Sequence, residues 1–456
     1  MRGLRLRRQP NAHIISYSLA NYPNLQVIRM NVLIVGGGGR EHALAWKAAQ
    51  SPHVNTVFVA PGNAGTALET GIENVPIAAE DIVALRYFAQ EHGVGLTIVG
   101  PEAPLVAGIV DEFRAAGLKC YGPTRAAAQL EGSKAFCKDF LARHRIPTAD
   151  YRTFARLPEA LAYIRQQGAP IVVKADGLAA GKGVVIARSE AEAIAAVQDM
   201  LSGNAFGAAG HRVVIEEFLR GEEASFIVMA DGVHALPMAT SQDHKARDNG
   251  DLGPNTGGMG AYSPAPVVTP AIHRRIMREV IEPTLAGMAA DGAPYTGFLY
   301  AGLMIDPDGA PKVLEYNCRF GDPETQPILM RLKSDLVELC LVALDEKLDR
   351  VQPEWDERPA LGVVLAAGGY PFDYRKGDPI SGLPIAESAD TKVFHAGTKK
   401  HDGHIVTAGG RVLCACALGE SVQEAQRKAY ELTGKIHWEG MYYRTDIGYR
   451  AIGRER

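Results

Sequence analysis

The chain has 456 residues, of which 46% are hydrophobic and 22% charged, and its formal net charge is −4. This composition is that of ordinary globular proteins, which excludes collagen-like, coiled-coil and disordered classes, and the length predicts three or more domains. The near-balanced charge argues against a nucleic-acid partner, and no apolar run approaches the roughly 20 residues that span a bilayer, so we expect no membrane partner.

Residues 1–29 hold five arginines and no acidic residue. An arginine-rich, acid-free leader resembles a transit peptide, but Met30 opens a clean strand at which an enzyme could simply begin. We therefore expect this segment to be untranslated or disordered, with a targeting role as the remaining alternative. Without it the chain would have 427 residues and a net charge of −9, from 43 basic and 52 acidic side chains.

Residues 30–131 alternate short β-branched runs with amphipathic stretches of helical length, which predicts a parallel α/β domain. The first glycine cluster, GGGGREHA at 36–43, follows a strand and opens a helix, a place that favours a phosphate or another anion. It is not a dinucleotide fingerprint, because Glu41 stands where the third glycine of G-x-G-x-x-G would be. A tight turn without a ligand is the alternative.

Residues 132–345 contain hairpin-like strands, which predicts an antiparallel α+β domain, with a mobile lid over about 150–222. Within VVKADGLAAGKG, Lys174 lies in a strand and Lys182 in a glycine-rich turn, so the hairpin can close over triphosphate oxygens. It is not a Walker A loop, because Gly183 rather than Ser or Thr follows the second lysine. A flexible surface hairpin is the alternative.

Two acidic patterns follow in the same region. Glu216 and Glu217 end a strand and Glu223 comes soon after, so they could receive an adenine amino group and ribose hydroxyls. This signal is weak on its own, because acidic runs are also common on surfaces.

The second pattern is KVLEYNCRFGDPETQ at 312–326. A strand period of two places Glu315 and Asn317 on one face, and both offer the hard oxygen ligands that Mg²⁺ prefers. Arg319 continues that face and suits an anionic substrate beside a metal-bridged phosphate. A structural salt bridge would explain Glu315 with Arg319 but would leave Asn317 without a role.

Between these patterns, residues 240–264 read as a long loop with few apolar side chains, and long ordered loops in compact domains are usually functional. Its polar and glycine residues suit a polar ligand; disorder is the alternative. After a proline-rich connector, residues 358–450 predict a third, smaller α/β unit. The six cysteines form no C-x-x-C pair, which argues against a disulfide framework and favours a reducing, cytoplasmic location.

Five segments together resemble one family, the phosphoribosylamine–glycine ligases, or glycinamide ribonucleotide synthetases, of the ATP-grasp superfamily. They are NVLIVGGGGREHALAW, VGPEAPLVAGIVD, VVKADGLAAGKGV, HKARDNGDLGPNTGGMGAYSP and LEYNCRFGDPETQP, and the resemblance covers residues 30–450. It implies a parallel-sheet N-terminal domain, ATP-grasp central domains and a small C-terminal α/β domain. It also implies that ATP, glycine and 5-phosphoribosylamine give glycinamide ribonucleotide, ADP and phosphate, with Mg²⁺ or Mn²⁺ as cofactor. We expect a monomer.

The resemblance also assigns roles to residues. ATP would be held by Lys134, Lys174, Gly181, Lys182, Gly183, Glu216, Glu217, Leu219 and Glu223. The metal would be bound by Glu315 and Asn317. Catalytic roles would fall to Arg319, Lys245 and Asp243. The substrates would meet Gly38, Gly39, Arg40, Glu41, Asn63, Gly257, Gly258, Met259 and Asp322.

Two departures from the family's pattern concern the site. The strand before Glu315 has no acid until Asp306, so metal ligation would rest on two side chains with phosphates and water. Ala246 stands where an arginine commonly follows the His-Lys pair, and Arg247 comes one residue later. The rival interpretations are another ATP-grasp carboxylate–amine ligase, a non-catalytic nucleotide-binding protein and, more distantly, a dehydrogenase.

Overall fold

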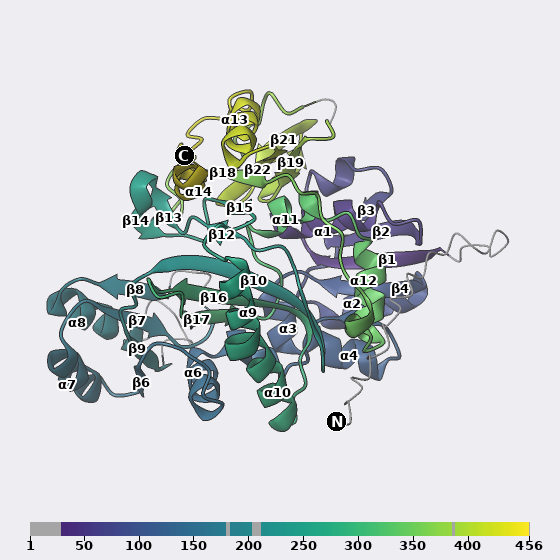
Figure 1. Ribbon diagram of the computed structural model, residues 1–456. Helices are drawn as coiled ribbons and strands as arrows, with labels where there is room; N and C mark the ends of the chain where they lie inside the picture. Colours follow the sequence, from purple (N-terminus) through teal and green to yellow (C-terminus); the bar gives the residue numbers. More distant parts are fainter. Residues whose placement is uncertain (1–28, 179–182, 203–210, 385–387, 456) are drawn as a thin grey trace, which may run out of the picture.

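The computed structural model describes residues 29–178, 183–202, 211–384 and 388–455, with side chains through 454. Gly181 and Lys182, two of the predicted ATP-binding residues, and the leader before residue 29 lie outside these ranges. In Figure 1 the N-terminal sheet, the larger central sheet and the C-terminal sheet lie together in one body. The strands of the lid, β6 to β9, lie at its edge. No helix in the described parts of the chain combines the length and the apolar character needed to cross a membrane.

The N-terminal unit is a parallel five-stranded sheet in the order β3-β2-β1-β4-β5, as the alternating sequence pattern predicts. Its strands are β1 Met30–Gly36, β2 Val54–Pro61, β3 Ile72–Asn74, β4 Val94–Val99 and β5 Cys120–Tyr121. The helical segments that follow them are α1 Gly39–Ala48, η2 Thr66–Leu68, α2 Ile82–Glu91, α3 Glu102–Ala107 and α4 Ile109–Ala115. The loops after β1 and β4 leave the same edge of the sheet, where ligands of parallel sheets bind.

The lid is an antiparallel sheet in the order β6-β9-β7-β8 with two helices packed on it. Its elements are β6 Tyr151–Phe154, α7 Leu157–Gln167, β7 Ile171–Ala175, β8 Val184–Ala187, α8 Glu190–Leu201 and β9 Val213–Glu217. The short helix α5 Gln129–Gly132 and helix α6 Lys134–Arg143 lead into the lid. Ser133 caps α6, since its hydroxyl accepts from the amide of Phe136 at 3.1 Å.

The second central sheet is antiparallel, in the order β11-β10-β16-β17. Its strands are β10 Glu222–Asp231, β11 Ala235–Pro237, β16 Thr296–Ile305 and β17 Pro311–Asn317. Its helical segments are α9 Pro270–Ile276, η5 Met277–Ile281, α10 Glu282–Ala290, α11 Thr325–Arg331, α12 Leu336–Leu344 and η6 Leu348–Arg350. Two shared hydrophobic clusters pack this sheet against the N-terminal sheet, which fixes the two units relative to each other.

The C-terminal sheet differs from what the sequence predicts, because strands from the predicted loop at 240–264 belong to it. The order is β12-β15-β18-β22-β19, all antiparallel. The elements are β12 Gln242–Asp243, β15 Gly260–Ser263, β18 Ala360–Ala366, β19 Thr391–His395, β22 Arg411–Leu418, α13 Val422–Thr433 and α14 Tyr449–Glu455. Two ribbons accompany it: β13 Ala246–Asp248 with β14 Leu252–Asn255, and β20 Thr398–His401 with β21 His404–Thr407; η4 Asn249–Asp251 lies within the first.

Candidate active site

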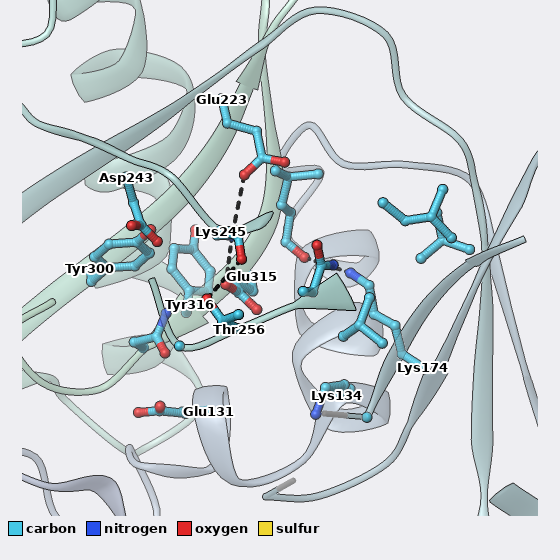
Figure 2. A pocket seen from close by; sticks show the side chains of 18 of the residues that line it. Glu131, Lys134, Lys174, Glu223, Asp243, Lys245, Thr256, Tyr300, Glu315 and Tyr316 are labelled. Atoms are coloured by element: carbon cyan, nitrogen blue, oxygen red, sulfur yellow. Dashed lines mark hydrogen bonds and ion pairs between the residues drawn. The ribbon is translucent and has the colours of Figure 1, made fainter. Parts of the chain in front are cut away.

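A cavity of about 970 Å³ lies where the lid, the second central sheet and the C-terminal unit meet. Its walls come from segments far apart in sequence, including α6, β7, β9, β10, β12 and β17. Figure 2 shows its side chains converging from these elements. Fifteen of the predicted residues line it: Arg40, Lys134, Lys174, Gly183, Glu216, Glu217, Leu219, Glu223, Asp243, Lys245, Gly257, Glu315, Asn317, Arg319 and Asp322.

One end of the cavity is rich in lysine. The Glu216 carboxylate is buried between two ammonium groups, with Lys174 Nζ at 3.0 Å from Oε1 and Lys138 Nζ at 2.9 Å from Oε2. Lys138 also donates to Thr148 Oγ1, and burial lowers its pKa against the opposing effect of Glu216. Lys134 donates to the carbonyl oxygen of Gly177. Lys138 and Lys174 share one buried carboxylate and Lys134 contacts a backbone carbonyl, so this end carries a positive charge that an anion can neutralise.

The centre of the cavity is occupied by Lys245, which lies between two carboxylates. Its Nζ is 3.3 Å from Glu223 Oε2 and 3.2 Å from Glu315 Oε1, as the dashed lines in Figure 2 show. Burial alone would lower the pKa of Lys245, but the two carboxylates raise it well above its usual range. Lys245 in turn lowers the pKa of Glu315 to about 2, so Glu315 is ionised at neutral pH.

Arg319 lies beside the predicted metal ligands and is held by carboxylates from two other segments. Its guanidinium is 3.3 Å from Glu102 of α3 and 3.0 Å from Glu131 of α5. It also donates to Asn317 Oδ1 at 2.7 Å. These contacts fix the plane of the guanidinium toward the cavity, so it can receive a negatively charged group in one orientation.

Glu315 and Asn317 fit a divalent cation. Both side chains lie on one face of β17, as the strand period predicts, and one supplies an ionised carboxylate and the other an amide oxygen. On the neighbouring strand β16 the residue opposite Glu315 is Gly302. That strand therefore adds no second carboxylate at this level, in line with the departure seen in the sequence.

The C-terminal unit also reaches the cavity. Arg411 of β22 donates to the Asp322 carboxylate at 2.7 Å and to the carbonyl of Gly257. Burial raises the pKa of Asp322 and Arg411 lowers it, with a net shift below its usual range. Tyr370 accepts from the amide of Gly257 at 3.0 Å. The loop at 257–258 is thereby held between the central and C-terminal units.

Two acids form the opposite end from the lysines. Asp243 ends β12 and accepts from the amide of His244 at 2.6 Å. Glu324 is only 2% exposed and accepts from the Ser225 hydroxyl at 2.8 Å, and that hydroxyl is 3.1 Å from the Tyr300 hydroxyl. Burial, and then the charge of Glu324, raise the pKa of Asp243 well above its usual range.

Comparison with known proteins identifies the family. Models of phosphoribosylglycinamide synthetase match the chain over 30–131 for the N domain, 132–325 for the ATP-grasp (A) domain and 360–450 for the C domain. Phosphoribosylamine–glycine ligases are 71% identical over 427 residues in Vibrio vulnificus and 69% identical over 428 residues in Salmonella typhimurium. Each alignment covers 94% of this chain and 100% of the relative. The chain belongs to the phosphoribosylglycinamide synthetase family.

Solved structures agree with this family membership. The phosphoribosylamine–glycine ligase of Thermotoga maritima is 37% identical, with a TM-score of 0.79, over 91% of this chain and 100% of its own. The biotin carboxylase domain of Hydrogenobacter thermophilus 2-oxoglutarate carboxylase is 16% identical, with a TM-score of 0.69, over 92% and 98%. At that identity the second likeness shows a shared fold alone. The predicted ATP-grasp architecture is confirmed.

Other predicted residues do not line the cavity. Glu41 accepts from the amide of Gly38 at 2.6 Å and from Arg40, so it closes the first glycine loop on itself. The Asn63 amide donates to the carbonyls of Gly37 and His395, which ties this loop to β19. Gly39 lies against Gln326, Gly258 lies against the cavity residue Asp243, and Met259 is fully buried in the C-terminal hydrophobic cluster. Met259 therefore packs inside this cluster and does not face the cavity.

Several cavity residues escaped the sequence analysis. Lys138 lies on helix α6, which carries two other basic residues near it in sequence, and the sequence alone does not reveal which of its lysines is buried. Glu102 lies in a segment that carries the family resemblance and Glu131 at a predicted domain boundary, and neither was assigned a role. Glu324 lies within a recognised motif, where its spacing from Glu315 gives no strand-face signal. Arg411 has no local signal, because it meets Asp322 across 89 residues of sequence.

Proposed function

We propose that this chain joins glycine to 5-phosphoribosylamine at the expense of ATP, giving glycinamide ribonucleotide, ADP and phosphate in de novo purine biosynthesis. The observation that carries the proposal is the cavity of a member of this family, in which a lysine-rich end, an ionised Glu315 with Asn317, and an acid end face one another. A carboxylate ligase needs each of these, because it must hold a triphosphate, a metal and a zwitterionic amino acid together.

ATP would lie along the lid. Lys134, Lys174 and the backbone at Gly183 suit its phosphates, and the turn containing Gly181 and Lys182 would complete that contact. Glu217, Leu219 and Glu223 suit the adenosine. Two lysines already pair with the carboxylate of Glu216. Glu216 would therefore contribute to ATP binding through its backbone groups and by positioning Lys174.

The metal would be Mg²⁺ or Mn²⁺, held by Glu315 and Asn317; when bound, it neutralises charge on the phosphate oxygens. Around it, Lys245 offsets the negative charge of the transferring phosphoryl group, and Arg319 faces the same part of the cavity from a fixed position. These side chains bind and orient, and they leave the covalent chemistry to the substrates.

The reaction would proceed in two steps through a glycyl phosphate. A carboxylate oxygen of glycine attacks the terminal phosphorus of ATP, the bond to the bridging oxygen breaks, and ADP leaves. The nitrogen of phosphoribosylamine then attacks the acyl carbon, the bond to the phosphate oxygen breaks, and that nitrogen loses a proton. Arg40, Gly38, Gly39, Gly257, Gly258 and Asp322 would surround the ribosyl substrate, with Asp243, Lys245 and Arg319 nearest the reacting atoms.

The proposal extends to the domain organisation and the oligomeric state. The domains would be 30–131, 132–345 with the lid at 150–222, and 358–450. We infer a monomer in the cytoplasm, since the chain provides lid, metal ligands and C-terminal arginine for the cavity by itself.

The decisive test is ADP release by the purified full-length chain with ATP, Mg²⁺ and glycine, with and without phosphoribosylamine. We expect rapid, glycine-dependent turnover only when phosphoribosylamine is present. Turnover with a different amine in its absence would identify a ligase with another acceptor. Nucleotide binding without glycine-dependent ADP release would reject catalysis altogether.

A further inference from the structure

The short helix α5 places a largely buried carboxylate, that of Glu131, in the wall of the cavity. Its side chain is only 10% exposed, and its two oxygens have different partners. Oε1 lies 3.0 Å from Nη2 of Arg319, whereas Oε2 accepts from the backbone amide of Cys318 at 2.7 Å and from its thiol at 3.0 Å. All of these partners are donors, which fits an ionised carboxylate that bridges two consecutive residues.

The contact with Cys318 replaces a hydrogen bond that the sheet no longer provides. Strand β17 ends at Asn317, which lies opposite Tyr300 of β16, and the paired register of the two strands ends there. The next residue, Cys318, is fully buried, so an unpaired amide at this position would be costly. Glu131 therefore fixes the main chain at the point where it leaves the sheet.

The guanidinium of Arg319 has little freedom left. Nε lies 3.3 Å from Glu102, and Nη1 donates to the carbonyl of Phe320 at 3.1 Å. Nη2 contacts Glu131 and also donates to Asn317 Oδ1 at 2.7 Å. A guanidinium has five N–H donors, and these contacts use four of them. Among the described residues, the fifth, on Nη1, has no acceptor, and the other four contacts decide where it points.

We propose that Glu131 is a positioning residue of the ligation reaction, which directs this remaining N–H of Arg319 into the cavity. The inference rests on the proposed function and adds to it a residue that acts through Arg319. Because Glu131 holds both the guanidinium and the main chain at Cys318, Arg319 cannot turn without breaking a buried contact. Glu102 holds the guanidinium alone.

The position of Glu131 in the chain also connects Arg319 to the lysine end. In Figure 2, Glu131 and Lys134 lie on the same wall of the cavity, below Lys245 and Glu315. Glu131 belongs to α5 and Lys134 begins α6, so the joint between these two helices carries both side chains. A fixed joint holds the groups around the reacting atoms at a constant separation, which is what positioning in an active site requires.

The first test compares Glu131→Gln with the unchanged protein in steady-state kinetics of glycine-dependent ADP release. Glutamine keeps the shape and an acceptor for Cys318, but it turns a donor toward Arg319. We expect kcat to fall roughly 10- to 100-fold, as for a reacting group displaced by about 1 Å, while the KM for ATP stays within about twofold. The affinity for ATP, measured by calorimetry without glycine, should also change by less than about twofold. Glu102→Gln should lower kcat less, because the contact with Cys318 remains.

A double-mutant cycle separates positioning from a merely structural role. Arg319→Ala should lower kcat at least as far as Glu131→Gln does. Adding Glu131→Gln to Arg319→Ala should lower kcat by no more than about twofold further, because the group through which Glu131 acts is already gone. Losses that multiply in the double variant would overturn the inference. An unchanged kcat in folded Glu131→Gln would also overturn it, while the wild-type activity would still support the proposed function.

Two further variants, checked by circular dichroism, address charge and folding. Glu112→Gln removes a carboxylate of α4 that pairs with Arg86 outside the cavity, and it should keep wild-type kcat. Glu131→Asp keeps the charge but is one methylene too short to reach Cys318 and Arg319 together. It should therefore lower kcat as well, and it tests the inference if Glu131→Gln does not fold. Loss of folding in both Glu131 variants would make the residue a structural anchor and overturn the inference.

Discussion

The two ends of the cavity differ in how their charges are balanced. At the lysine end, Lys138 and Lys174 pair with Glu216 while Lys134 contacts a backbone carbonyl, and positive charge is in excess. At the acid end, Asp243 and Glu324 form no ion pair with a described side chain, and the charges of Lys245 and Arg411 offset only part of the rise in the pKa of Asp243. Burying an uncompensated charge destabilises a fold, so an imbalance that persists in a cavity marks the sign of the ligand it receives. The cavity therefore suits an anionic group at one end and a positively charged group at the other.

The largest expected effect lies between the two ends. Glu315→Ala removes an ionised carboxylate that faces the reacting groups and belongs to the proposed metal site. We expect kcat to fall roughly 1,000-fold or more, as for the loss of a group that stabilises transition-state charge. The fold should survive, because Lys245 keeps its contact with Glu223 at 3.3 Å. The measurement is glycine-dependent ADP release, with circular dichroism to check folding.

A surface variant provides the matched control for this prediction. Glu279→Ala also removes a carboxylate, but one on η5 that pairs with Arg275 of α9, outside the cavity. It should keep wild-type turnover. If Glu315→Ala retained more than about a tenth of wild-type activity, the metal assignment to β17 would have to be abandoned.

The next effect tests the lysine end. Lys138→Met removes one of the two ammonium groups that share Glu216, so that carboxylate then neutralises Lys174 alone. We expect the KM for ATP to rise roughly tenfold, because the excess positive charge is lost, with little change in the KM for glycine. Lys138→Arg keeps the charge and should retain more ATP affinity than the methionine variant. An equal rise in both KM values would show general damage to the cavity instead of a loss specific to the lysine end.

The two ends also differ in how far the sequence predicts them. Lys174, Glu315, Asn317 and Arg319 were found from strand period and glycine-rich turns, because the spacing that places them is local. The parallel N-terminal sheet was predicted for the same reason, since its central strands β1 and β4 are short apolar runs that are each followed by a helix.

The acid end depends on long-range pairing, which local spacing does not reveal. Asp243 lies in a strand that joins the C-terminal sheet through β15, whereas its polar neighbours made the segment read as a loop. Glu324 contacts Ser225 across 99 residues, and Lys138 of helix α6 pairs with Glu216 on strand β9 of the lid. A pattern of residue types identifies the groups that face a ligand, but the partners that balance their charges become visible only in the fold.

The smallest expected effect concerns His244, which lies between Asp243 of the acid end and Lys245. It is fully buried, with Nδ1 at 3.1 Å from the Gly260 carbonyl and Nε2 accepting from the Gly448 amide at 3.1 Å. This pattern fits a neutral ring, and burial, followed by the nearby charges of Arg444 and Arg450, lowers its pKa from 6.5 to about 4.

Between pH 6.5 and about 4, the unfolded chain therefore binds a proton at His244 that the folded chain does not. As the pH falls through this window, the free energy of unfolding therefore decreases by about 1.4 kcal/mol per pH unit because of this group. Above pH 6.5 this group makes the free energy of unfolding nearly independent of pH. We expect the unchanged protein to lose about 2 kcal/mol more stability than His244→Asn between pH 7 and pH 5, measured by urea unfolding. Parallel stability profiles for the two proteins would mean that the ring is already charged in the folded state, and that the segment joining the two ends is anchored differently.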